Sequence, residues 1–141
     1  MERFLPFIQF ALFYLEYITY IIILLYPMNS IIQKPWGSYQ ILEKNKNHLV
    51  KNIIVKPGAA LSLQSHKYRS EHWVVVKGTA TVTIEKEIKN LKSNESVFIP
   101  KSAKHRLTNN NKEDLIVIEV QYGDLLQEED IIRYEDIYNR K

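Results

Sequence analysis

The chain has 141 residues, of which 45% are apolar and 25% charged, which suits one globular domain of modest size. It has no cysteine, which excludes a disulfide scaffold, a thiolate metal site and a cysteine nucleophile. Its four glycines lie far apart, which excludes a glycine-rich phosphate loop, and a net charge of +3 is too weak to favour nucleic acid as a partner.

The first 28 residues differ in composition from the rest, because only three of them are charged. As a helix, residues 4–26 would be about 34 Å long, enough to cross a bilayer. Glu16 near the middle is costly there, and Pro6 and Pro27 bracket the segment. We therefore consider three interpretations: a membrane anchor, a start-site artefact with the true start at Met28, and a packed helix. They predict either a cytoplasmic protein or one anchored to a membrane.

Residues 29–141 are expected to form a second domain, in which short apolar runs alternate with turn signals. The runs that predict strands are residues 52–56, 60–66, 71–76, 79–85, 96–99, 105–108 and 115–121. Strands at this spacing are typical of a sandwich or barrel. A helical period occurs only in residues 125–138, where four residues would form one face: Ile131, Ile132, Tyr134 and Ile137. The predicted fold class is all-β, with a short C-terminal helix.

Four polar residues in two compact segments predict a metal site. Gln64 and His66 are two apart on a predicted strand, so their side chains leave the same face. Glu71 opens the next strand, which we expect to pair antiparallel with the first, and His105 comes from a later strand. An amide oxygen, two imidazoles and a carboxylate suit Zn²⁺, Mn²⁺, Fe²⁺, Co²⁺ or Ni²⁺ and leave positions open for water or substrate.

The segments that hold these residues resemble the paired motifs of the cupin superfamily. Residues 58–78 follow the spacing of the first motif, with Gln64 in place of its usual first histidine. Residues 94–109 follow the spacing of the second, with Asn94 and Ser102 in place of the usual glycines. The resemblance implies a double-sheet jelly-roll barrel and, by analogy with cupins, a homodimer.

Shorter matches in the same order make the resemblance more specific. Residues 34–39 (KPWGSY), 69–76 (RSEHWVVV) and 130–133 (DIIR) are similar to one group, and the likeness covers residues 33–141. That group is the C-terminal isomerase domain of bifunctional mannose-1-phosphate guanylyltransferase/mannose-6-phosphate isomerase. It implies interconversion of mannose 6-phosphate and fructose 6-phosphate, on the way to GDP-mannose and polysaccharide. It also implies a divalent metal, zinc foremost, on four ligands: Gln64, His66, Glu71 and His105.

The resemblance assigns further roles. Arg69 matches the family's active-site arginine, and Arg133 and Arg140 match arginines of its C-terminal pieces. The isomerisation needs a base that moves a proton between C1 and C2, for which the candidates are a metal-bound hydroxide, Tyr68 and Glu119. The candidates for binding the substrate phosphate are cationic: Arg69, Lys101, Lys104, Arg106, Arg133 and Arg140.

Two departures from the family leave rival interpretations open. Lys67 and Tyr68 replace a run of histidines, which favours a non-catalytic cupin that only binds a sugar phosphate. No guanylyltransferase half matches, which favours a gene remnant or a split isomerase beside a separate guanylyltransferase chain. His72, one residue after Glu71, is expected to point away from the metal site as a packing or interface residue.

Overall fold

The computed structural model describes residues 14–18 and 30–140 of the chain. The chain divides into two compact units, Met1–Ser30 and Ile31–Lys141. Residues 14–18 are helical, and among the described residues no helix is long and apolar enough to cross a membrane. The membrane-anchor and start-site interpretations concern residues 1–28, most of which lie outside the described residues.

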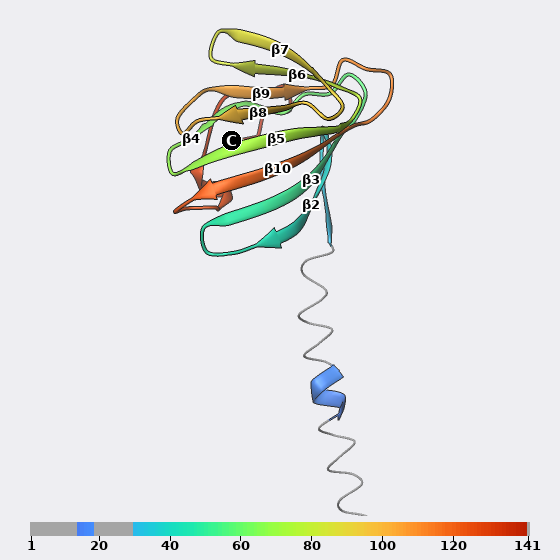
Figure 1. Ribbon diagram of the computed structural model, residues 1–141, viewed down its shortest axis with the longest axis vertical. Helices are drawn as coiled ribbons and strands as arrows, with labels where there is room; N and C mark the ends of the chain where they lie inside the picture. Colours follow the sequence, from blue (N-terminus) through green and yellow to red (C-terminus); the bar gives the residue numbers. More distant parts are fainter. Residues whose placement is uncertain (1–13, 19–29, 141) are drawn as a thin grey trace, which may run out of the picture. The chain divides into compact units, whose positions relative to one another are not determined.

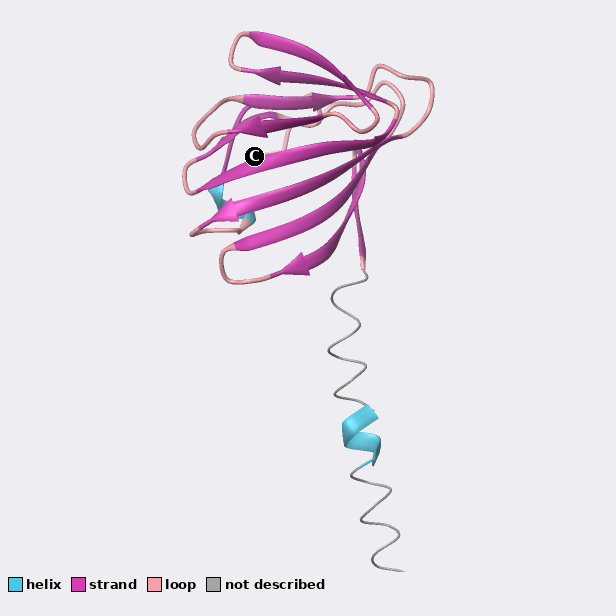
Figure 2. Ribbon diagram, viewed as in Figure 1, coloured by secondary structure: helices cyan, strands magenta, loops and turns pink. Residues whose placement is uncertain are grey.

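The second unit consists of two antiparallel β-sheets (Figure 1). The first sheet has the strand order β1-β2-β3-β10-β5-β8, and the second has the order β11-β4-β9-β6-β7. Figure 2 shows that strands and connecting loops make up almost all of this unit, so the all-β prediction is confirmed. The strands of the first sheet are β1 (Ile31–Lys34), β2 (Gly37–Lys44), β3 (His48–Val55), β10 (Leu115–Gly123), β5 (Arg69–Lys77) and β8 (Ser96–Ile99). Those of the second are β11 (Ile131–Glu135), β4 (Leu63–His66), β9 (His105–Thr108), β6 (Thr79–Ile84) and β7 (Glu87–Lys92).

Buried and more exposed residues alternate along the strands, and the buried ones form a core between the two sheets. In the first sheet Val55, Trp73 and Val117 are buried, and they share one apolar cluster with Val82 and Leu107 of the second sheet. The sheets therefore pack face to face, as in a β-sandwich. Each fully buried side chain of this kind contributes about 1.5–3 kcal/mol relative to its exposed state.

The C-terminal region differs from the prediction. The only helix in residues 125–138 is a 3-10 turn, η1 (Glu128–Asp130), and the prediction of a helical face beyond it is wrong. Residues 131–135 instead form β11, which pairs antiparallel with β4 and closes the edge of the second sheet. Two β-branched residues, Ile131 and Ile132, suit a strand, and pairing with an otherwise free edge outweighs the local helical period.

The connection between β4 and β5 also differs from the prediction. The two strands were expected to pair with each other, yet β4 pairs with β9 and β11, while β5 pairs with β10 and β8. Lys67 and Tyr68 cross from one sheet to the other. Glu71 therefore reaches His66 across the interior rather than along one sheet.

Two residues that stand at the usual glycine positions adopt the left-handed backbone that glycine favours. The φ angle of Asn94 is 71° and that of Ser102 is 67°. For a non-glycine residue this backbone costs about 1–2 kcal/mol. The Ser102 N–H donates to the carbonyl of His66 at 2.7 Å. The strained turn before β9 is thereby tied to the end of β4, which helps to bring His105 and His66 together.

Candidate metal centre

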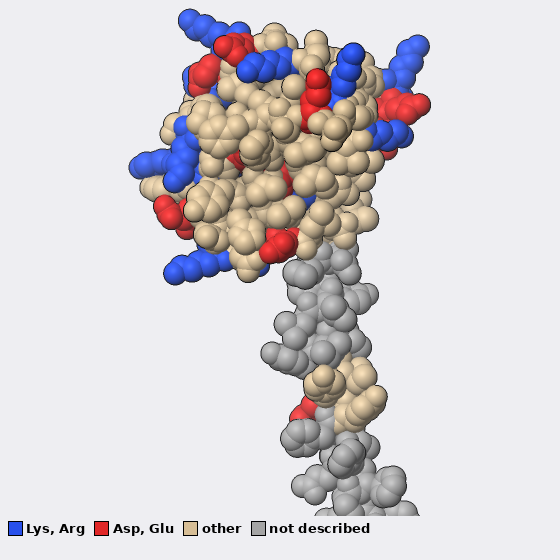
Figure 3. All heavy atoms as spheres, in the orientation of Figure 1, with Lys and Arg blue, Asp and Glu red and all other residues tan. Residues whose placement is uncertain are grey.

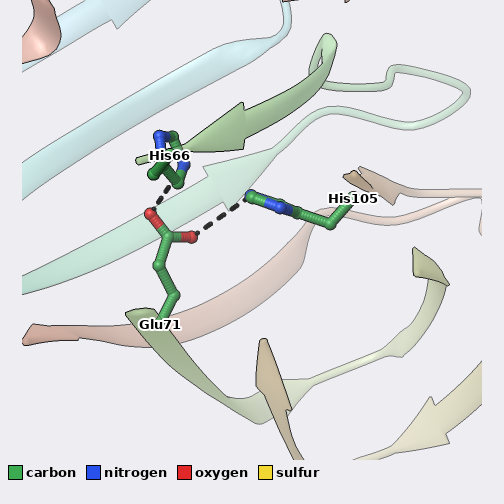
Figure 4. Close-up of side chains that lie close together, drawn as sticks. All are labelled: His66, Glu71 and His105. Atoms are coloured by element: carbon green, nitrogen blue, oxygen red, sulfur yellow. Dashed lines mark ion pairs between the residues drawn. The ribbon is translucent and has the colours of Figure 1, made fainter. Parts of the chain in front are cut away.

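Three side chains converge in the interior between the two sheets (Figure 4). His66 ends β4, Glu71 lies in β5, and His105 begins β9. The Nε2 atom of His66 lies 3.0 Å from Oε1 of Glu71, and Nε2 of His105 lies 3.6 Å from Oε2. All three residues are at most 2% exposed. Because the two sheets contribute to it, the cluster forms only when they are packed together.

The second ring nitrogen of each histidine faces a backbone carbonyl. Nδ1 of His105 lies 2.9 Å from the carbonyl oxygen of Ala103, and Nδ1 of His66 lies 3.4 Å from that of Asp130. A carbonyl only accepts, so Nδ1 of His105 carries a hydrogen, and Nε2 would offer its lone pair to a metal once it has given up its own proton. Within the described part of the chain, this buried Nε2 has no hydrogen-bond partner. Carbonyl contacts of this kind orient histidines that bind metals.

The donor set fits a divalent metal. Two atoms bound to a tetrahedral zinc at about 2.0–2.1 Å lie about 3.3 Å apart. The nitrogen–oxygen separations of 3.0 and 3.6 Å fall on either side of that value. Burial raises the pKa of Glu71, but the facing imidazoles of His105 and His66 lower it by more, so the pKa lies well below its ordinary value and the carboxylate is ionised.

Gln64, the fourth predicted ligand, lies on β4 directly opposite His105 of β9. Its Nε2 lies 3.5 Å from Nε2 of His66, and its Oε1 accepts a hydrogen bond from the hydroxyl of Ser62 at 2.8 Å. A rotation of the amide by half a turn would direct Oε1 at the cluster, and the Ser62 hydroxyl can accept as well as donate. The structure therefore brings all four predicted ligand residues together.

A second buried carboxylate, Glu119, lies beside Glu71. The indole N–H of Trp73 is 3.1 Å from an oxygen of each carboxylate, and Nε2 of Gln121 donates to Glu119 at 2.7 Å and to Glu71 at 3.3 Å. Burial and the charge of Glu71 raise the pKa of Glu119 to about 7, against the lowering effect of Lys51 at 3.8 Å. A carboxyl group in this environment accepts and releases a proton near neutral pH.

An open cavity lies next to the two carboxylates, and Gln64, Glu71 and Glu119 line it. More cations than carboxylates border the cavity, which suits an anionic ligand. The cations are Lys34, Lys51, Arg69, Arg133 and Arg140, and the carboxylates are Glu71, Glu119 and Glu128. Of the residues predicted for catalysis and phosphate binding, the structure thus brings Arg69, Arg133, Arg140 and Glu119 to one place.

Arg69 is almost completely buried beside the cluster, at 2% exposure. Its Nε donates to Oε1 of Glu71 at 3.3 Å, and its Nη1 donates to the carbonyl of Gln127 at 2.8 Å. Nη1 also lies 3.8 Å from the carboxylate of Asp130. Arg69 therefore links the metal-binding carboxylate to the η1 segment, which makes it a positioning residue as well as a cavity residue.

The remaining predicted residues lie away from the cavity. Tyr68 is 42% exposed in the turn between the sheets. Nζ of Lys104 lies 4.2 Å from the ring centre of Tyr134, and Arg106 forms a salt bridge of 2.9 Å with Glu135. Four candidates are therefore absent from the described cavity lining: Tyr68, Lys101, Lys104 and Arg106.

Lys51 is a cavity residue that the sequence reasoning missed. It lies in β3 at a buried position, between Leu49 and Ile53 in the inward row of the strand. Its Nζ lies 4.6 Å from the ring centre of Tyr39 and 3.6 Å from Glu128. A lysine at a core position of an alternating strand is the signal that could have identified it.

Comparison with known proteins identifies the family of this chain. The family described as mannose-6-phosphate isomerase C-terminal matches residues 25–136. The chain belongs to this family. It is 49% identical over 113 residues to the mannose-1-phosphate guanylyltransferase ManC of Salmonella typhimurium, covering 80% of this chain and 24% of the relative. It is 50% identical over 109 residues to the alginate biosynthesis protein AlgA of Pseudomonas putida, covering 77% and 22%. The chain thus spans about a quarter of the length of these curated relatives.

Solved structures confirm the cupin fold that the sequence predicted for this member of the isomerase family. An RmlC-like cupin from Shewanella frigidimarina superposes with a TM-score of 0.62 at 22% identity, covering 70% of this chain and 86% of that one. The capsular polysaccharide assembling protein CapF from Staphylococcus aureus gives 0.65 at 21% identity, covering 76% and 32%. At these identities the likeness establishes the fold alone.

Proposed function

We propose that this chain is a metal-dependent isomerase that interconverts mannose 6-phosphate and fructose 6-phosphate. The observation that carries the proposal is that Glu71 of the His–Glu–His cluster and the arginines Arg133 and Arg140 line one cavity. Such an isomerase needs an electrophile at the sugar oxygens and cations at the phosphate, within the length of one substrate. Membership of the isomerase family supports the same reaction.

The metal would be held by His66, Glu71 and His105, with Gln64 as a fourth ligand. When bound, it would polarise the sugar oxygens and stabilise the negative charge that develops on them. Zinc is our first expectation, and Mn²⁺, Co²⁺, Fe²⁺ and Ni²⁺ also suit a nitrogen and oxygen donor set.

Arg133 and Arg140 are the cations that we assign to the substrate phosphate. Both guanidinium groups can bind a phosphate through two parallel hydrogen bonds. Arg140 is already oriented, because its Nε and Nη2 each donate to the carboxylate of Asp136 at 2.8 Å. A side chain held in this way loses little conformational entropy when it binds an anion.

We assign the proton transfer between C1 and C2 to Glu119. Its carboxylate is buried, lines the cavity and is held by Trp73 and Gln121. Its position beside Glu71 would place it near sugar oxygens and carbons that approach the metal. Tyr68, the other side chain considered as a base, does not line this cavity.

The names of the relatives support a proposal for the cellular role of the isomerase, and two residues of this chain favour an alternative function. These names include mannose-1-phosphate guanylyltransferase and alginate biosynthesis protein, so we propose that the isomerase feeds GDP-mannose and polysaccharide synthesis. Because the chain spans about a quarter of those relatives, a separate guanylyltransferase chain is a fitting partner. Lys67 and Tyr68, in place of the expected histidines, favour the alternative of a cupin that binds a sugar phosphate without turning it over.

A coupled assay on the full chain separates these functions. The protein, loaded with Zn²⁺, Mn²⁺ or Co²⁺, is given mannose 6-phosphate, and the formation of fructose 6-phosphate is followed. We expect turnover that a chelator abolishes and added metal restores. Glu71→Gln should remove it, while Glu129→Gln, which changes an exposed carboxylate, should not. If the protein binds metal and sugar phosphate without turnover, the result would support the non-catalytic binding cupin. If it shows no binding and no turnover, the result would support a gene remnant.

A further inference from the structure

Lys51 is a charged residue at a core position. Figure 3 shows many Lys and Arg side chains that project from the surface, where a long charged side chain is usually found. Lys51 instead occupies the buried row of β3, between Leu49 and Ile53, and it is 9% exposed. An ammonium group that is buried loses its hydration, and this loss has to be compensated by groups that accept its hydrogens.

The contacts of Lys51 within the protein leave its hydrogen-bond donors unused. Its Nζ lies 3.8 Å from Oε1 of Glu119 and 3.6 Å from Oε1 of Glu128, and both separations are longer than a hydrogen bond. It also lies 4.6 Å from the ring centre of Tyr39. Among the described residues none accepts a hydrogen bond from Nζ, although the ammonium group has three N–H donors and the side chain lines the cavity. These donors are available to a molecule in the cavity.

Lys51 lies beside the group to which we assign the proton transfer. Strands β3 and β10 pair so that Lys51 is directly opposite Glu119, and β10 and β5 pair so that Glu119 is opposite Trp73. The indole of Trp73 contacts both Glu119 and Glu71, so a row of neighbouring side chains leads from Lys51 to the metal cluster. A ligand oxygen next to Glu119 is therefore within reach of Lys51.

The charges around Lys51 favour neutral oxygens over a phosphate. Glu119 and Glu128 flank the ammonium group, so a phosphate dianion placed there would also meet two carboxylates. Hydroxyl and carbonyl oxygens accept hydrogen bonds from an ammonium group without that repulsion. The surroundings of Lys51 thus suit a polyol, whose hydroxyl groups accept from the ammonium group and donate to the carboxylates.

We propose that Lys51 donates hydrogen bonds to the sugar oxygens of the substrate beside Glu119, and so distinguishes a sugar phosphate from other phosphates. The identity of the sugar rests on the proposed function. As Glu119 takes a proton from carbon, negative charge develops on the neighbouring oxygens, and an ammonium group within hydrogen-bond distance stabilises it. A site built to hydrogen-bond hydroxyl groups also discriminates against ligands that lack them.

The dissociation constants of mannose 6-phosphate and of inorganic phosphate, measured by calorimetry on the zinc-loaded full chain, test this proposal. Lys51→Met keeps an unbranched side chain and removes its donors. We expect it to weaken the binding of mannose 6-phosphate at least about tenfold and to leave that of inorganic phosphate within a factor of about two. Lys77→Met, which removes an exposed lysine that pairs with Glu113, should change neither.

The same substitution in a Glu119→Gln background separates a direct contact from an indirect effect. Loss of Lys51 leaves the carboxylate of Glu119 without its neighbouring cation, and this alone could disturb the ligand. Glu119→Gln has no carboxylate there, so a loss of mannose 6-phosphate affinity that persists in the double variant comes from Lys51 itself. Because we expect Glu119→Gln to turn over slowly, the measurement in this background reports binding.

Three results would overturn the proposal. Equal weakening of both ligands would place Lys51 at the phosphate. An unchanged affinity for mannose 6-phosphate, or a loss that disappears in the double variant, would mean that Lys51 does not contact the sugar. A wild type that binds mannose 6-phosphate no more tightly than inorganic phosphate would have no sugar contact to lose.

Circular dichroism identifies a variant that fails to fold, and Lys51→Gln, whose shorter side chain carries no charge, then takes the place of Lys51→Met. The affinities do not depend on turnover. A failure of the proposed isomerase function, seen in the coupled assay, is therefore distinguished from a failure of this proposal.

Discussion

Glu71 meets both imidazoles of the metal cluster through opposite oxygens of one carboxylate. In Glu71→Gln the shape of the side chain is preserved and its charge is lost. We expect the affinity for Zn²⁺ to fall at least about a hundredfold, because the amide neither neutralises the ion nor offers two oxygen donors. Metal content per chain after dialysis, measured by atomic emission, checks this. A variant that keeps full metal content would remove Glu71 from the ligand set.

Glu119 allows the base to be tested separately from the metal. Glu119→Gln keeps a group of the same size between Trp73 and Gln121 but cannot accept the substrate proton. We expect kcat for the isomerisation to fall about a hundredfold or more, with metal content unchanged. Steady-state kinetics on metal-loaded protein checks this, and kcat within a factor of about two of wild type would exclude Glu119 as the base.

Arg133 and Arg106 test whether the substrate phosphate binds in the cavity. Both were candidates for binding it, and only Arg133 lines the cavity. Losing a charged hydrogen bond of about 1.5–3 kcal/mol corresponds to a rise in KM of roughly 10–150-fold. We expect this rise for Arg133→Ala, with kcat little changed, and no rise for Arg106→Ala. Substrate titrations of the two variants check the prediction, and the reverse order would contradict the assignment.

Among the elements, β11 and the tail after it bring cations to the cavity. Asp136 accepts hydrogen bonds from the backbone and side chain of Arg140, and these lower its pKa to about 2. The stabilisation is fully present above the ordinary pKa of 3.8 and is lost as the pH falls towards about 2. We expect Asp136→Asn to unfold at a lower temperature than wild type near neutral pH, with the difference disappearing at about pH 2. Thermal scans at a series of pH values check this.

Short strands bounded by turn residues were predictable from the sequence, and so were the ligands they carry. β8 and β9 have the predicted bounds, because Pro100 ends the first run and turn residues flank both. β7 was missed because five of its six residues are exposed and three are charged, so apolar residues do not recur at every second position. The helix expected at residues 125–138 failed for a different reason, since the pairing of β11 with β4 is a long-range contact that the local period of the sequence does not encode.

Prediction of the site from the sequence has the same limit, because local patterns do not show which sheet a strand joins. Residue spacing and the resemblance to the cupin motifs predicted that Gln64, His66, Glu71 and His105 meet, although the strand pairing expected to bring Glu71 there was wrong. They were not enough to show that Tyr68 crosses between the sheets and stays exposed, or that Lys51 faces inward beside Glu119. Both depend on which sheet each strand joins, and that is fixed by the strand pairing of the whole domain.

For the whole molecule, metal binding and folding are linked. A metal that binds only the folded state stabilises it by about 2.7 kcal/mol at a free concentration one hundred times its dissociation constant. For a domain of this size we expect the unfolding temperature to rise by about 10 °C. Differential scanning calorimetry with Zn²⁺ and with a chelator measures the rise. Glu71→Gln serves as the control, because it should show none.

The origin of the ligands in two layers also constrains how the protein can move. His66 and His105 belong to one layer and Glu71 to the other, so a bound ion would act as a cross-link between them. The layers could then not separate to admit a substrate without breaking the centre that acts on it. A sugar phosphate would have to enter by the mouth of the cavity while the sheets stay packed. Hydrogen exchange in β4 and β9 would slow on metal binding, while β7, at the far edge of its sheet, would exchange as before.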